Sequence, residues 1–74
     1  MTLNECKKGN TYIIKNIMVE DRIIRRLEAL GLIDGTRIDL LNKKRYGAVI
    51  IKVRGTRIAL GKDLAMGIEV SANE

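Results

Sequence analysis

The chain has 74 residues, the size of one small domain with a modest core. It carries 14 basic and 9 acidic residues, a net charge of +5, and no histidine, so the commonest general base and transition-metal ligand is missing. Cys6 is the only cysteine, which rules out a disulfide within the chain and fits a reducing cytosol. We see no signal peptide and no apolar run of membrane-spanning length, and we expect a cytoplasmic protein.

The apolar composition predicts an aliphatic core and a mainly β fold. Hydrophobic residues make up 46% of the chain, yet Tyr12 and Tyr46 are its only aromatic residues. A core rich in isoleucine, leucine and valine suits a small barrel. We therefore expect residues 1–74 to form a single domain, a small barrel of five short strands with one helix and a short helical turn.

The first predicted strand covers residues 11–19, with a bend near Lys15 and Asn16. A helix of about ten residues follows, in which Ile23, Leu27 and Leu30 recur at helical spacing and Ile24 widens the apolar stripe. We expect this helix to lie across one opening of the barrel and to bury that stripe in the core. Its N-cap is left open between three residues: Val19, Glu20 and Asp21.

Gly31 is expected to end the helix, because glycine adopts the left-handed conformation without a Cβ penalty. With Gly31 at the C′ position, Leu27 and Leu32 occupy the two positions that touch in a Schellman ending. Both are leucine, which supports the assignment. We expect Leu30, the residue before Gly31, to be structural as well and to contribute to the core.

The rest of the chain reads as strands separated by glycine turns. Asp34-Gly35 predicts one turn, and a hairpin turns at Arg54-Gly55 or Gly55-Thr56. Residues 62–66 form the short helical turn, with Gly61 or Asp63 as its cap. The remaining strands are expected at residues 36–41, 48–54, 56–60 and 68–70, with Ile38, Leu40, Val49, Ile51, Val53, Ile58 and Leu60 facing inward.

Three stretches, RLEALGLIDGTRIDLL, VIIKVRGTRIAL and DLAMGIEV, together resemble the ferrous iron transport protein A (FeoA) family over almost the whole chain. The resemblance implies a small SH3-like barrel that acts as a cytosolic accessory or regulatory protein of bacterial ferrous iron uptake. It also implies a partner, the cytosolic part of the membrane GTPase transporter FeoB. The residues that carry it are Arg26, Leu27, Leu30, Gly31, Leu32, Gly35, Gly55, Ile58, Ala59, Leu60, Ala65, Ile68 and Val70.

Two alternatives stay open beside this reading. The first is a stand-alone SH3-like lobe related to iron-dependent repressors. The second is a basic nucleic-acid-binding barrel, which the scarcity of aromatic residues disfavours because single strands usually stack on aromatic rings. Self-association into a homodimer also stays open.

Reactive chemistry is not expected. The glycines form no phosphate-binding loop, and Cys6 has no second thiol with which to hold a metal within one chain. Two chains sharing a metal through Cys6 is an alternative to a simple free thiol. We therefore expect no enzyme activity, no catalytic residue, no cofactor and no metal site.

Two basic clusters are the candidate partner-binding residues. Like charges repel at the spacing of the helical cluster, which suggests an acidic contact, and the second cluster lies on a loop, where binding residues are common. A solvated surface is the plainer interpretation of both. The three arginines of the helix are expected on the side away from Leu27 and Leu30, and Glu28 is expected to pair with Arg25. The clusters are Arg22, Arg25 and Arg26 on the helix and Lys43, Lys44 and Arg45 in a basic loop at residues 42–47.

Overall fold

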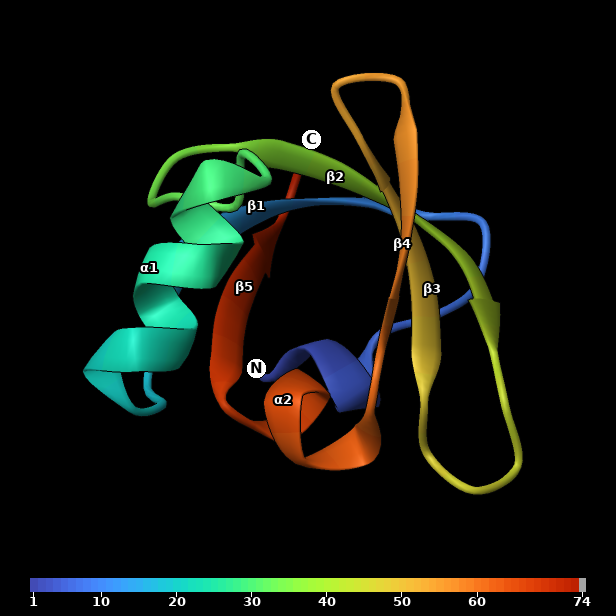
Figure 1. Ribbon diagram of the computed structural model, residues 1–74. Helices are drawn as coiled ribbons and strands as arrows, with labels where there is room; N and C mark the ends of the chain where they lie inside the picture. The colour runs from blue at the N-terminus through green and yellow to red at the C-terminus, as the bar shows by residue number, and fades with distance from the viewer. Residues whose placement is uncertain (74) are drawn as a thin grey trace.

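The computed structural model describes residues 1–73, in which five antiparallel strands form one sheet that curls around an aliphatic core (Figure 1). The strands lie in the order β4-β3-β2-β1-β5, so the first strand is held between the second and the last. The elements in chain order are η1 (Leu3–Glu5), β1 (Thr11–Ile17), α1 (Asp21–Ala29), β2 (Arg37–Lys43), β3 (Val49–Val53), β4 (Thr56–Leu60), α2 (Lys62–Met66) and β5 (Ile68–Ala72).

Alternation along the strands fills the core as the sequence predicts. In β3, the side chains of Val49, Ile51 and Val53 are buried while Lys52 between them is exposed. The predicted bend in the first strand is confirmed, because the β1–β5 register shifts between Ile14 and Asn16. The other buried residues are Leu3, Cys6, Tyr12, Ile14, Leu27, Leu32, Ile38, Leu40, Leu60, Ala65, Ile68 and Val70.

The predicted end of α1 is confirmed in detail. Gly31 has a φ of +96°, which places it in the left-handed region. The Leu32 N–H donates to the Leu27 carbonyl at 2.9 Å, and the Gly31 N–H donates to the Glu28 carbonyl at 2.9 Å. This is the Schellman pattern, and both leucines are buried. At the other end Glu20 is the N-cap residue, one of the three alternatives, and no side chain caps the helix there.

The structure corrects the expected role of α1. Leu30 was expected in the core, but half of its surface is exposed, and Ile23 is only partly buried. Leu27 is the one side chain of α1 that is fully buried. The helix lies alongside the curled sheet, whereas η1 and α2 pack against each other at its open end (Figure 1). Closing that opening is therefore the work of η1 and α2.

Three other predictions needed adjustment. The first strand ends at Ile17, the second runs on into the expected basic loop as far as Lys43, and the last reaches Ala72. The N-terminal segment was given no structure, yet it forms η1 and buries Leu3 and Cys6. It also covers the outer side of β5, because the Val70 N–H donates to the Met1 carbonyl at 2.8 Å.

A candidate protein-interaction surface

A hollow of about 300 Å³ separates α1 from β4. Its walls are almost entirely aliphatic, and the half-exposed Leu30 stands at its border. An apolar surface that water can reach is unfavourable unless something covers it, which makes this hollow a candidate contact site. Its lining residues are Ile23, Arg26, Leu27, Leu30, Ile58, Ala59, Leu60 and Leu64. We call it the α1–β4 hollow.

The α1–β4 hollow runs along the edge of β4 and not over one face of the strand. Successive side chains of a strand point to opposite faces, so Ile58 and Leu60 lie on one face and Ala59 on the other. All three line the same hollow. Only its edge brings both faces of a strand into one space.

Three arginines from different elements lie around the α1–β4 hollow. Arg26 of α1 lines it directly. Arg54, in the β3–β4 turn, does not line the hollow itself, but its side chain packs over Gly31, next to Leu30 at the end of α1. Arg57 is exposed on β4 itself, next to Ile58. No carboxylate within residues 1–73 comes within 4.0 Å of any of them, because the one ion pair in that part of the chain joins Arg22 to Glu20.

The turn that delivers Arg54 is the first of the two predicted alternatives. Arg54 and Gly55 have φ values of +51° and +82°, and Val53 pairs with Thr56 on either side of them. Two central residues with positive φ define a type I′ turn. Positive φ is unusual for arginine, so having Arg54 in this position carries a conformational cost.

The six sequence-predicted cations fall into two separate places. Arg22, Arg25 and Arg26 are exposed on α1, whereas Lys44 and Arg45 lie in the β2–β3 connection, at the opposite end of the molecule in Figure 1. The remaining cation, Lys43, ends β2 at that same connection. The structure therefore does not join the two clusters into one surface.

Two details of the helical cluster differ from expectation. Arg26 was expected on the side away from Leu27 and Leu30, but it lines the same hollow as both leucines. Glu28 was expected to pair with Arg25, but no such ion pair forms among residues 1–73. Glu28 instead borders a second hollow on the other side of α1.

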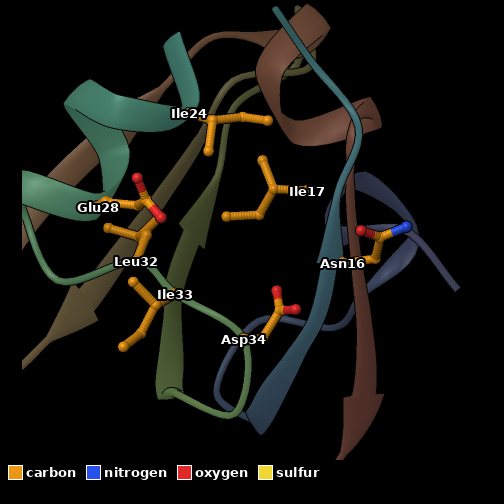
Figure 2. A pocket seen from close by; sticks show the side chains of 7 residues that line it. All are labelled: Asn16, Ile17, Ile24, Glu28, Leu32, Ile33 and Asp34. Carbon is orange, nitrogen blue, oxygen red and sulfur yellow. The ribbon is translucent and has the colours of Figure 1, made fainter. Parts of the chain in front are cut away.

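That second hollow, of about 510 Å³, lies between α1 and β1 (Figure 2). Glu28 from α1 and Asp34 from the following loop both show their carboxylates in this view. The two hollows beside α1 thus differ in charge, since Glu28 and Asp34 line the one toward β1 and Arg26 lines the one toward β4. Within residues 1–73, no three acidic or thiol side chains gather as metal ligands would.

Sequence reasoning missed the contribution of β4. Arg54, Arg57 and Ala59 were given no binding role, because nothing local distinguishes them from other exposed strand and turn residues. Their significance comes from the tertiary fold, in which β4 and α1 line the same hollow. The one sequence feature that could have indicated this region is the Arg54-Gly55 pair, because arginine is uncommon in a type I′ turn.

Cys6 is buried against Met1, with 3.6 Å between the two sulfur atoms. Burial raises the pKa of the Cys6 thiol above its ordinary value. Its side chain therefore serves as a small core residue and stays protonated at neutral pH. Next to it, the Lys7 N–H donates to the hydroxyl of Tyr12 at 2.8 Å, which satisfies the buried phenol.

The sequence model of the FeoA domain matches residues 1–72, nearly the whole chain. The chain belongs to the FeoA family. The FeoA resemblance seen in the sequence is thereby confirmed. A "Putative Fe(2+) transport protein A" of Methanocaldococcus jannaschii is 34% identical to this FeoA-family chain over 68 residues, which cover 92% of the chain and 82% of that relative.

Two solved FeoA structures show the same fold. One, described as an iron uptake regulatory protein (FeoA), superposes with a TM-score of 0.83 at 34% identity, covering 96% of this chain and 93% of the other. The second is FeoA of Stenotrophomonas maltophilia complexed with zinc, with a TM-score of 0.81 at 28% identity and coverage of 96% and 89%. The latter is described as an SH3 domain protein, so the predicted SH3-like fold is confirmed.

A manganese-dependent transcriptional repressor also shares this fold, with a TM-score of 0.89. The identity is 20%, and the chain covers 41% of that repressor, so the likeness concerns the fold alone. Membership of the FeoA family makes this chain an accessory protein of ferrous iron transport. No helix within residues 1–73 is long and apolar enough to cross a bilayer.

Proposed function

We propose that this FeoA-family chain acts in the cytosol by binding the cytosolic part of the membrane GTPase transporter FeoB. The α1–β4 hollow with its arginine border carries this proposal, because an accessory protein needs a surface for another protein. Leu30, exposed at the border of an aliphatic hollow, has the character of an interface anchor. The chain contributes recognition and leaves GTP hydrolysis to its partner.

The arginines give the surface its preference. Arg26, Arg54 and Arg57 have no carboxylate partner within residues 1–73, so an acidic patch on the transporter can pair with them without displacing existing ion pairs. Such pairing speeds encounter and fixes orientation more than it adds affinity. The mechanism then follows from linkage: if the chain binds one nucleotide state of the transporter more tightly, it shifts the transporter toward that state.

Nucleic acid is a weaker candidate on this structure. Tyr12 is buried, which leaves Tyr46 as the one exposed aromatic ring of the chain. A single ring offers one stacking position, whereas binding to single strands usually relies on several. A filter-binding assay across salt concentrations checks this directly, because phosphate contacts produce a steep salt dependence.

The test of the proposed function is a pull-down of the transporter's cytosolic domain, without nucleotide, with GDP and with a non-hydrolysable GTP analogue. We expect retention that differs among the three states. The double variant Arg26→Ser/Arg57→Ser should lose retention. The matched control, Lys44→Ser/Arg45→Ser, removes the same charge from the opposite end and should keep it. Failure to retain the domain in all three states would overturn the proposal.

A further inference from the structure

The outer edge of β4 is unprotected. Within residues 1–73, β4 pairs with β3 alone, because it is the terminal strand of the sheet. The other terminal strand, β5, is treated differently: Thr2 bridges to Glu69 there, and Met1 accepts a hydrogen bond from Val70. An open strand edge is a template on which another extended segment can pair.

The register identifies which backbone groups face outward. Val53 and Thr56 flank the two-residue turn, and in such a hairpin the flanking pair exchanges both of its hydrogen bonds. Hydrogen-bonded residues then alternate along an antiparallel strand. Thr56, Ile58 and Leu60 accordingly bond to β3. The N–H and C=O groups of Arg57 and Ala59 point away from the sheet.

These outward groups lie beside the α1–β4 hollow. Ala59 is one of its lining residues, and the aliphatic walls continue from Ile58 across to Leu30 of α1. An added strand would present alternate side chains to the two sides of its backbone. Apolar residues on one side would meet the hollow, and acidic residues would reach Arg57 and Arg54.

We infer that β4 accepts a short extended segment of the partner, rich in acidic and aliphatic residues, as an additional strand of the sheet. The inference rests on the proposed function only for the identity of the partner; the strand edge and its chemistry stand apart from it. Main-chain hydrogen bonds would supply affinity, and the hollow and arginines would supply selectivity. The charge of the site selects an acidic segment over a basic one.

The first experiment uses one substitution that removes a single outward donor. Proline at position 59 has no N–H, and proline is tolerated on an edge strand when that N–H faces away from the sheet. Ala59→Pro should therefore fold yet bind the transporter's cytosolic domain about tenfold more weakly, the effect of losing one well-made hydrogen bond and leaving its acceptor unpaired. The matched control, Ala59→Ser, keeps the N–H and should bind more tightly than Ala59→Pro.

The second experiment examines the same strand edge in the unmodified chain, so it tests the inference even if Ala59→Pro does not fold. The probes are a synthetic peptide alternating glutamate with isoleucine, its lysine-for-glutamate counterpart, and the transporter domain. Amide hydrogen exchange of the full chain is followed residue by residue. The acidic peptide and the domain should slow exchange at Arg57 and Ala59 about tenfold or more, and the basic peptide should leave both unchanged.

The outcomes separate this inference from the proposed function. If the domain binds while the Arg57 and Ala59 amides exchange at their free rates, strand addition is wrong and the proposed function stands. If the acidic peptide protects both amides but the domain does not bind, strand addition stands and the proposed function is wrong. Protection that rises with the chain's own concentration, without either probe, would assign the edge to a second copy and overturn the inference.

Discussion

The side chain of Arg54 lies over Gly31, so the β3–β4 turn and the end of α1 meet at one point. A Cβ atom on Gly31 would stand 3.3 Å from Cδ of Arg54. The left-handed φ of Gly31 already disfavours any side chain, and the arginine adds a steric reason. This contact ties the only long helix in residues 1–73 to the hairpin that borders the α1–β4 hollow.

Replacing this glycine should destabilise the fold. Gly31→Val places a β-branched side chain at a φ of +96° and presses it against Arg54, at a cost of about 2 kcal/mol. Ala59→Val is the control, because Ala59 is exposed on a strand, where valine is well accepted. Thermal unfolding followed by circular dichroism compares the two. Equal melting temperatures would refute the role assigned to Gly31.

Replacing Arg54 should change stability and partner binding in opposite directions. Asparagine is a preferred first residue of a type I′ turn, whereas arginine at a φ of +51° is strained. Arg54→Asn should therefore raise the unfolding free energy by about 1 kcal/mol while weakening retention of the transporter domain. Urea unfolding and the pull-down measure the two effects. A variant that gains stability and binds as well as before would show that Arg54 is not part of the interface.

Two leucines of α1 should separate core from surface. Leu27→Ala removes a fully buried side chain and should cost about 2–5 kcal/mol of unfolding free energy. Leu30→Ala affects a half-exposed residue and should cost less than about 1 kcal/mol, yet reduce binding to the transporter domain. Urea denaturation of both variants measures this. Comparable losses of stability in the two variants would show that Leu30 is a core residue.

Stability should fall in alkaline solution through Cys6. Its pKa is raised by burial, so above the ordinary thiol pKa of 9.0 the unfolded chain loses a proton that the folded chain keeps. Deprotonation then favours the unfolded state, and the contribution is lost progressively as the pH rises through the folded-state pKa. Other groups titrate in the same range, so urea unfolding of the unmodified chain and of Cys6→Ala is compared from neutral to alkaline pH. The difference between the two should shrink as pH rises; a constant difference would contradict the assignment.

Local patterns were sufficient for the helix end and the strand faces. The pairing of Leu27 with Leu32 around Gly31 depends on six consecutive positions, all visible in the sequence. The buried face of β3 follows from alternation alone. Such features involve short separations along the chain, so the sequence specifies them without knowledge of the tertiary fold.

Features that depend on distant segments could not be predicted in the same way. Helical spacing shows that Leu30 lies near Leu27, but it does not show whether another element covers it. The arginine border requires β4 to lie beside α1, which depends on how the whole sheet curls. The segment that contains Leu3 and Cys6 is too short to display a period, which is why η1 was missed.

The position of β1 between β2 and β5 has a consequence for how the chain is made. The first strand to be synthesised must wait for the last before its second edge is paired, since Tyr12 opposes Ala72. During translation the sheet therefore stays open until residue 72 has left the ribosome's exit tunnel, and it then closes over a long sequence separation. Closure over such a separation makes this small domain a slow folder for its size.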